Sequence, residues 1–364
     1  MRPTCGARLA ISAARSADFA IAIFSFPQPP TAPYPSLMQN TRHRREGFSA
    51  LPFAGVIFVS LFVANAGAQR SSPKPVPRMQ AVPLPNQEIS FQRDGTELAR
   101  YYFNTNLNRP FIYPIIGPSG RSLTRMGHPR DPESHSHHNS VWISHNDVNG
   151  VSFWDDKGKG RILHRRIERL DDGDSAASVL TLNEWTAASG EVLARERRLT
   201  TVQWLPRNEW LLLLDLQLEP ARDEVTFGKT PFGLIGVRMA KTIGVNDGGG
   251  TIRNSEGAVN EKDVFWKPAR WVDYTGPITP KAVEGIALFD HPTNPGHPSI
   301  FHVRNDGWMG ASLTHSAPLK LTSGKPLTLR YALYIHAGLP SIDTLQRRWF
   351  DFAGTAPALF SQKK

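Results

Sequence analysis

One cysteine occurs in the 364 residues of the chain, and it lies at position 5, far from the segments that resemble a folded domain. From residue 69 onward no thiol is left to form a disulfide, to ligate a metal or to act as a nucleophile. Cysteine-based zinc sites, blue-copper sites and cysteine catalysis are therefore excluded for this part of the chain. Its stability has to come from a hydrophobic core, and roughly 300 residues suffice for one large domain or two closely packed ones.

The sequence also lacks a stripe of Lys and Arg interleaved with aromatic residues, and it has no recognition-helix pattern. The formal net charge is +10, but residues 1–68 contain six Arg and two acidic residues, so the remainder carries only +6. These charges are scattered, whereas nucleic-acid binding requires basic residues clustered on one face. We therefore expect no nucleic-acid partner.

Apolar runs of membrane-spanning length are missing as well. Residues 51–64 form an apolar run of about 14 residues, short of the about 20 that a spanning helix needs. Basic residues at 42–45 precede this run, and small residues in an Ala-x-Ala pattern end it. This order is typical of a secretory signal peptide, for which Met38 is a natural start, and it favours export over the alternative of a single membrane anchor.

The sequence thus divides into four parts. We predict an N-terminal extension or misassigned start over 1–37, a signal peptide over 38–68, a Pro-rich linker over 69–86 and a single β-sandwich domain over 87–364. Cleavage is expected near Ala66 or Ala68, and the product would be a periplasmic or extracellular protein with no spanning segment.

From Glu88 onward, short runs rich in Val, Ile, Thr, Phe and Trp alternate with Gly, Asn, Asp and Pro, as strands alternate with turns. Their spacing of roughly 10 to 20 residues favours an all-β sandwich over alternating strands and helices. The sequence shows no internal repeat, so a propeller is not expected. The predicted strands are 88–92, 97–103, 111–116, 141–145, 151–154, 162–170, 177–186, 191–204, 209–219, 231–240, 284–290, 298–304 and 327–336.

One helix is predicted, over residues 340–352, where apolar residues recur at helical spacing. Residues 191–204 and 209–219 are predicted to form a hairpin of two long strands. The continuous Leu run in the second of these strands suits a strand that is covered on both faces. The predicted fold class is all-β: a large antiparallel β-sandwich of two stacked sheets, with one short C-terminal helix.

The segment GHPRDPESHSHHNSVWISHNDVNGVSFWDD, residues 127–156, contains five of the twelve histidines of the chain: His128, His135, His137, His138 and His145. On a straight strand, His135 and His137 would lie about 6.6 Å apart on one face, but His145 would lie roughly 26 Å from His137. A joint site therefore requires the loop 127–140 to fold back over a sheet, as functional loops on rigid scaffolds do.

Three interpretations of this segment stay open. A metal site would need three or four ligands about 2 Å from the ion; His135, His137 and His138 could supply them together with nearby carboxylates, although no helical His-x-x-x-His spacing occurs. Proton transfer is the second interpretation, because imidazole titrates near pH 6.5. The third is a solvated loop whose histidines cap turns and bind backbone groups.

The segment GIALFDHPTNPGHPSIFHVRNDGWMG, residues 285–310, carries a second polar cluster. Asp290 and His291 directly follow an apolar run, and Asn294 lies in the Pro-rich stretch behind them. His302 and Arg304 share one face of the next predicted strand because side chains alternate with a period of two. Sandwich loops gather at common ends, so we expect the two polar segments to converge on one site.

Arg238 is the single charge in the apolar run 231–240. A buried guanidinium needs a carboxylate or a ligand anion, so Arg238 either binds substrate or forms a structural salt bridge with Asp215 or Glu219. Tryptophans such as Trp142 punctuate the same regions. Their faces suit a sugar ring, and core packing explains them equally well.

Several of these motifs, in order from about residue 88 to 338, resemble a known family. SHSHHNSVWISHNDVNGVSFW, GKTPFGLIGVRMA, NSEG, WVDYTGP and the segment 285–310 are similar to exported bacterial proteins called PmoA-like, or "methane oxygenase PmoA". The resemblance implies a galactose-mutarotase-like supersandwich, and enzymes of that fold act on sugars with a His acid and a carboxylate base. The name is borrowed from an integral membrane protein, so methane oxidation is not expected of a chain without a segment of spanning length.

The combined prediction is an exported enzyme that acts on a sugar or modified glycoside, as a hydrolase, lyase or epimerase, by histidine acid/base chemistry. The alternatives are a non-catalytic sugar-binding or scaffold protein and a His-ligated metal enzyme. No cofactor is expected, with a divalent metal on His135, His137 and His138 as the alternative. The predicted catalytic residues are His137, His138, Asp290 and His302, and the predicted substrate-binding residues are His145, Arg238, His291, Asn294, Arg304 and Trp142.

Overall fold

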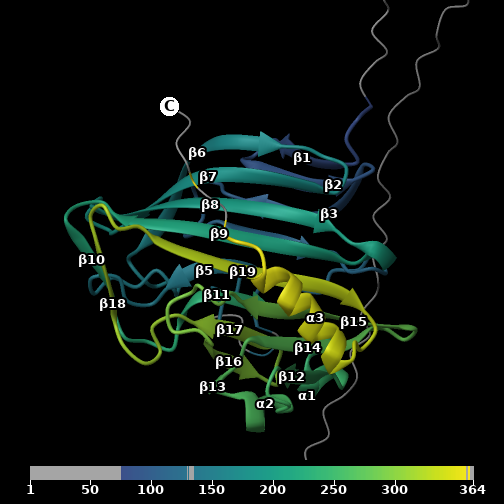
Figure 1. Cartoon of the computed structure of the whole chain (residues 1–364). Helices are drawn as coiled ribbons and strands as arrows, with labels where there is room; N and C mark the ends of the chain where they lie inside the picture. The colour runs from purple at the N-terminus through teal and green to yellow at the C-terminus, as the bar shows by residue number, and fades with distance from the viewer. Residues whose placement is uncertain (1–74, 129, 131–134, 358–359, 361–364) are drawn as a thin grey trace, which may run out of the picture. The chain divides into compact units, whose positions relative to one another are not determined.

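Two antiparallel β-sheets dominate the computed structural model, which describes residues 75–128, 130, 135–357 and 360 (Figure 1). One sheet consists, in spatial order, of β1 (Met79–Leu84), β2 (Glu88–Arg93), β3 (Thr96–Tyr102), β4 (Phe111–Ile115), β5 (Val141–His145), β11 (Gly233–Arg238), β17 (Trp308–Ser312), β16 (Ile300–Arg304) and β13 (Lys267–Pro268). We call this nine-stranded sheet the first sheet. The predicted signal peptide and N-terminal extension lie outside the described residues.

The second sheet has eight strands. In spatial order they are β12 (Thr251–Asn254), β14 (Trp271–Thr279), β15 (Ala282–Asp290), β19 (Leu327–Ala337), β9 (Trp210–Pro220), β8 (Val192–Trp204), β7 (Ala176–Thr186) and β6 (Arg161–Asp171). The remaining elements are the ribbon of β10 (Glu224–Phe227) and β18 (Leu319–Thr322), the helices α1 (Val245–Gly248), α2 (Asn260–Val264) and α3 (Ile342–Ala353), and the 3-10 turns η1 (Pro206–Asn208) and η2 (Lys241–Ile243).

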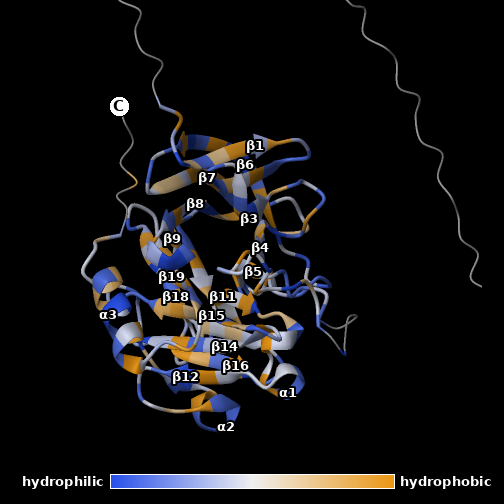
Figure 2. Ribbon diagram, turned by 90° about the vertical axis from the view of Figure 1, so that its right-hand side faces the viewer, coloured by the Kyte–Doolittle hydropathy of each residue, from blue (hydrophilic) through white to orange (hydrophobic). Residues whose placement is uncertain are grey.

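One hydrophobic core lies between the two sheets, and strand alternation fills it. On β9, Leu212 and Leu214 point into this core, while Leu211 and Leu213 contact the apolar cluster beneath α3. The Leu run is therefore covered on both faces, as the sequence predicts. Figure 2, turned by 90°, shows α3 on the outer side of β9 and β19.

Helix α3 begins at a capped residue and packs through a single face. The Ser341 hydroxyl accepts a hydrogen bond from the backbone N–H of Thr344 at 3.2 Å, which satisfies one of the unpaired donors of the first turn. Leu345, Trp349 and Phe352 are buried against the outer face of the second sheet. No helix among the described residues is long and apolar enough to cross a membrane.

The predicted fold class is confirmed, because the described chain is a large antiparallel β-sandwich with a C-terminal helix. The hairpin of β8 and β9 also forms, with Trp204 paired to Trp210. The strand predicted at 151–154 was wrong: Val151 makes only an isolated bridge with Val148, within a tight turn.

Part of the predicted linker 69–86 was also wrong, because residues 79–84 form strand β1. Met79 and Ala81 alternate into the core, and β1 pairs with β2 along its whole length. Pro83 is tolerated because β1 is an edge strand, where a missing N–H donor breaks no ladder on the open side. The proline content therefore marks a sheet edge in this segment.

Candidate functional site

A cavity of about 510 Å³ lies on the outer face of the first sheet, within the size range of small-molecule sites. We call it the histidine pocket. Its walls combine imidazoles, aromatic rings and charged groups. The lining residues are His128, His135, His137, His138, Asn146, Trp154, Asp155, Phe232, Arg238, His302, Arg304, Asp306 and Trp308.

Strand alternation decides which side chains reach this pocket. On β16, Phe301 and Val303 enter the core, so His302 and Arg304 point outward into the pocket. On β17 the outward residue is Trp308, which is paired in register with Arg238 of β11. The three neighbouring strands β11, β17 and β16 thus each supply at least one side chain to the same cavity.

The described residues of the loop 127–140, which we call the histidine loop, lie over this face and bring their histidines together. The ring centroids of His137 and His138 are 4.6 Å apart, and those of His135 and His138 are 4.9 Å apart. His138 stacks on Trp308 at 5.0 Å and on Trp142 at 5.5 Å. Trp142 therefore supports the pocket from beneath, although it does not line it.

A glycine allows the two indoles to lie this close to the sheet. A Cβ atom at Gly236 of β11 would come within 2.5 Å of Trp308 and 2.9 Å of Trp142, closer than carbon atoms approach. The bare backbone at position 236 therefore makes room for the aromatic floor of the pocket.

Arg109 holds the histidine loop against the loop 153–156. Its guanidinium is buried and donates to the backbone oxygen of Phe153 at 3.1 Å and to the Oδ1 of Asn139 at 2.8 Å. It also forms an ion pair with Asp156 at 3.2 Å. One side chain thus fixes two loops that carry pocket residues, His137 on one and Trp154 on the other. No pattern in the sequence marks Arg109 for this role.

Asp306 connects the polar groups at one end of the pocket. Its Oδ1 accepts a hydrogen bond from Arg238 Nη1 at 2.9 Å, and its Oδ2 lies 2.9 Å from Nε2 of His128. Burial raises the pKa of the Asp306 carboxyl, but Arg238 and the hydrogen bond from His128 outweigh burial and lower the pKa overall. The carboxylate is therefore ionised at neutral pH. Neither Asp215 nor Glu219, the partners expected for Arg238, takes this place; Asp215 pairs with Arg330 at 3.0 Å.

Three imidazoles of the pocket, those of His137, His138 and His302, are uncharged at neutral pH. Burial, followed by the positive charge of Arg109, lowers the pKa of His137 to about 4. Burial and Arg304 likewise lower the pKa of His302 to about 4. Burial lowers the pKa of His138 further still, and His137 adds to this shift. These histidines can accept a proton or donate a neutral N–H at pH 7, but they do not carry charge.

Several buried polar atoms in and below the pocket have no hydrogen-bond partner within the described chain. They are Nδ1 of His138, Nδ1 of His302, Nε and Nη2 of Arg238, and the indole nitrogens of Trp142 and Trp308. Buried polar groups in folded proteins are normally paired, and exceptions cluster at functional sites. Their concentration here marks this face of the first sheet as a functional candidate.

The two polar segments converge on the histidine pocket, as the sequence predicts, since His302 and Arg304 line it together with His137 and His138. Four other predicted site residues lie away from this pocket, which corrects their assignment to the site. Asp290 ends β15 of the second sheet, where its carboxylate accepts hydrogen bonds from Asn294 at 2.7 Å and from the backbone N–H of Ser299 at 2.8 Å. His291 binds the backbone oxygen of Thr355 at 2.9 Å. The polar groups of these residues thus have hydrogen-bond partners, and their contacts connect the loop after β15 to neighbouring segments.

His145 is the fourth of these residues. On β5, His145 has the same parity as Val141 and Ile143, which point into the core. Its ring therefore lies 5.2 Å from that of Phe227, another core residue. Its Nε2 lies 2.8 Å from the Thr314 hydroxyl. The remaining predicted residues, His137, His138, Arg238, His302 and Arg304, line the pocket, with Trp142 beneath it.

The pocket also contains residues that the predicted site leaves out. Asn146, Trp154, Asp155, Phe232, Asp306 and Trp308 belong to this group. Asp306 and Trp308 lie in the second polar segment, and the turn between β16 and β17 could have indicated them. Phe232 and Trp154 come from loops whose path the sequence does not determine.

A metal centre is not assembled by the residues that the structure describes. Among them, no group of three or more His, Cys, Asp or Glu side chains is arranged to hold a metal ion. His135, His137 and His138 lie close together: the rings of His135 and His137 are stacked at 24°, and the ring of His138 is edge-on to both, at 65° and 81°. Of the carboxylates that the metal interpretation adds, Asp131 and Glu133 lie outside the described residues, and Asp147 accepts a hydrogen bond from the backbone N–H of Gly150 at 2.8 Å and does not line the pocket.

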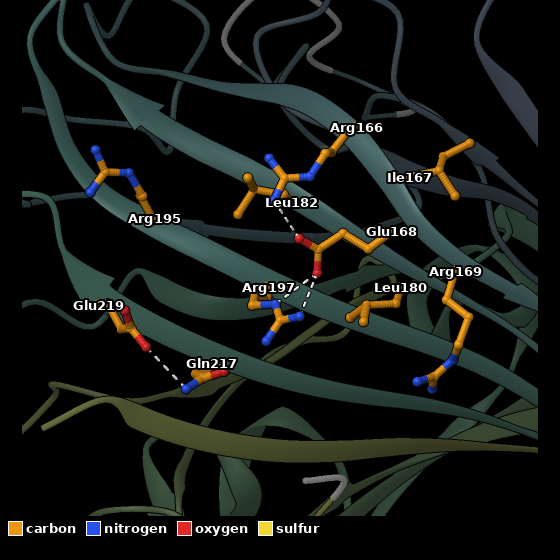
Figure 3. Close-up of a pocket in the computed structure, with 10 residues that line it drawn as sticks. All are labelled: Arg166, Ile167, Glu168, Arg169, Leu180, Leu182, Arg195, Arg197, Gln217 and Glu219. Carbon is orange, nitrogen blue, oxygen red and sulfur yellow. Dashed lines mark hydrogen bonds and ion pairs between the residues drawn. The ribbon is translucent and has the colours of Figure 1, made fainter. Parts of the chain in front are cut away.

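A larger cavity, of about 770 Å³, opens on the outer face of the second sheet over β6 to β9 (Figure 3). Its arginines are paired with nearby carboxylates: Glu168 accepts from Arg166 at 2.7 Å and from Arg197 at 2.8 Å. Arg169 and Arg195 pair with Asp171 and Glu184 beside the cavity. Gln217 donates to Glu219 at 3.0 Å. The charged groups are therefore satisfied by their neighbours, and the residues that line the cavity include no histidine and no aromatic ring. Size alone therefore does not make it the better candidate.

Residues 88–350 match the sequence profile of DUF6807, a family of unknown function, and the chain belongs to that family. No curated protein matches it. Among solved structures, a GalM/aldose epimerase homologue from C. elegans is similar over 72% of this chain and 100% of its own, with 8% identity and a TM-score of 0.31. A 4-alpha-glucanotransferase from Thermococcus litoralis is similar over 72% of this chain and 40% of its own, with 11% identity and a TM-score of 0.29.

Proposed function

We propose that the histidine pocket binds a carbohydrate and that its neutral histidines accept a proton during a reaction of the bound sugar. A sugar ring has apolar faces and hydroxyl edges. The pocket offers partners for both, because the rings of Trp154, Phe232 and Trp308 lie beside the polar side chains of Arg304 and Asp306. Export of the chain and its place among the PmoA-like proteins belong to the same proposal.

The observation that carries the proposal is a set of uncharged imidazoles beside an ionised carboxylate. His137 and His302, with pKa values of about 4, are unprotonated at neutral pH and can act as bases. Nδ1 is buried in both His138 and His302, so Nε2 is the nitrogen expected to reach the sugar. Arg304, half exposed at the rim, can stabilise negative charge that develops on a substrate oxygen.

This arrangement suits reactions that begin with the removal of a proton. Abstraction from a carbon next to a carbonyl starts an epimerisation or an elimination, and abstraction from water starts a hydrolysis. Two opposed carboxylates, as in ordinary glycosidases, are not needed for such a first step. Asp290 has no part in it, because it lies in the second sheet and is fully hydrogen-bonded.

Turnover of a panel of sugars tests the proposal. The panel contains glucose, galactose, mannose, xylose and galacturonate, each as the monosaccharide, the methyl glycoside and the tetrasaccharide. On a substrate that is turned over, His302→Gln and His138→Gln should each lower kcat by roughly 10²–10⁴-fold. His164→Gln is the matched control, because burial also lowers the pKa of His164 to about 4 and this residue lies outside the pocket.

The alternatives give different results. Sugar binding without turnover would make the chain a non-catalytic binding protein. Loss of tightly bound metal from the His138→Gln variant, with a lower melting temperature, would make the pocket a metal site, because a metal that binds only the folded state stabilises it. If no sugar binds, the proposal fails.

A further inference from the structure

The histidine pocket does not end at His302. The imidazole of His302 is flanked on one side by Trp308 at 5.9 Å and Phe232 at 5.6 Å, which line the pocket. On another side lie Phe265 at 5.2 Å and Trp266 at 6.2 Å, which do not line it. His302 therefore stands at the boundary between the pocket and a second group of rings.

Trp266 is the most unusual member of this group. It leaves 44% of its surface exposed, and its backbone has a φ of 53°, in the left-handed region that bulky residues rarely occupy. Its ring stacks on Phe265 at 4.4 Å. Core packing does not explain a large aromatic side chain that is held outward in a strained conformation.

The exposed aromatic side chains of the described chain are few and unevenly placed. They are Phe232, Trp266 and Phe350. Phe232 and Trp266 both contact His302, whereas Phe350 lies on α3, over the second sheet. Exposed aromatic rings beside a polar pocket are a common feature of binding surfaces.

A second, smaller cavity lies next to a histidine that contacts Trp266. His315, whose ring is 5.6 Å from Trp266, lines a cavity of about 200 Å³ together with Ile300 and Ser312. Ile300 lies two residues before His302 on the outward face of β16. On β17, Trp308 lines the first cavity and Ser312 the second. Four residues of strand span about 13 Å, more than a single sugar ring covers.

We propose that the two cavities and the Trp266 ring between them form one groove, and that the groove binds an oligosaccharide. One sugar unit would occupy the histidine pocket, and further units would lie over Trp266 towards His315. The inference rests on the proposed function, because it assigns the same pocket a longer ligand. It adds a binding site at Trp266 and His315 that the predicted site residues do not include.

The test compares the affinities of matched ligands by isothermal titration calorimetry. The probes are the monosaccharides of the panel above and their tetrasaccharides. The wild-type chain should bind at least one tetrasaccharide more tightly than its monosaccharide. Trp266→Gly, which suits the positive φ, should lower this preference about 3- to 10-fold, the range expected for the loss of one ring contact.

Phe350→Ala is the matched control, because it removes an exposed aromatic ring from the other sheet and should leave the preference unchanged. His315→Ala should lower the preference in the same direction as Trp266→Gly. Equal affinity for monosaccharide and tetrasaccharide, or a preference that survives Trp266→Gly, would overturn the inference while sugar binding in the pocket stands. If neither probe binds, the proposed function itself fails, and the inference fails with it.

Discussion

Acidification from pH 7 to pH 4.5 should destabilise the folded protein through its buried histidines. Burial lowers the pKa of His137, His145, His164 and His302 to about 4. In the unfolded chain each would titrate near 6.5. Between these two values the unfolded state binds protons that the folded state does not, so stability falls as the pH falls through this range and becomes constant only above about pH 7.5.

The size of the effect follows from the shifts. Each such histidine removes up to about 1.4 kcal/mol of unfolding free energy per pH unit. Four of them, over two units, would remove roughly 11 kcal/mol, within the 5–15 kcal/mol that typically stabilises a domain. His138, whose pKa burial lowers further still, adds to this loss. Glu284 acts in the opposite direction, since burial raises its pKa, but one group cannot offset four. The pKa of Asp306 is lowered, so its own effect appears only below this window.

Urea denaturation followed by tryptophan fluorescence at pH 7.5, 6.5, 5.5 and 5.0 measures this dependence. The free energy of unfolding should fall only slightly between pH 7.5 and 6.5 and fall steeply below. In His302→Gln the slope below pH 6 should be smaller by about 1.4 kcal/mol per unit. A stability that is flat or rises from pH 6.5 to 5.0 would refute the assignment of buried, neutral imidazoles.

Two further predictions concern residues outside the histidine pocket. Asp290→Ala leaves Asn294, His297 and the Ser299 N–H without their acceptor. Chemical denaturation should therefore show a loss of about 3 kcal/mol in the free energy of unfolding, with unchanged kcat in the folded fraction. Lost turnover at unchanged stability would instead make Asp290 catalytic. Export predicts a mature N-terminus near Gln69 in protein recovered from the periplasm, determined by N-terminal sequencing, and recovery of the intact chain from the cytoplasm would contradict it.

The sequence predicts the long strands well because their side chains record which faces are buried. The Leu run of β9 and the alternation of β16 both carry that information. Strands whose sequence contains turn residues were not predicted. β14 pairs with β15, with a register shift between Pro277 and Thr279, although it contains Asp273 and Gly276, since tertiary contacts override local preference.

The candidate site was predictable only where strand parity determines it. His302 and Arg304 share a face by their spacing alone. Asp290 looked equally suitable because it also ends an apolar strand, but nothing in the sequence reveals that β15 belongs to the other sheet. Sheet membership is a long-range property, and the strand order joins β11 to β5, almost a hundred residues away.

The buried guanidinium of Arg109 restricts how the two loops that it contacts can move. It holds carbonyl oxygens of the 153–156 loop and the amide oxygen of Asn139 at the same time. If either loop moved alone, the charge would lose partners within a dry interior, which costs several kcal/mol. The histidine loop and the Trp154 loop should therefore shift together as one rigid rim. If the pocket binds a sugar as proposed, the sugar would enter past Arg304 and Phe232, which are among its more exposed residues.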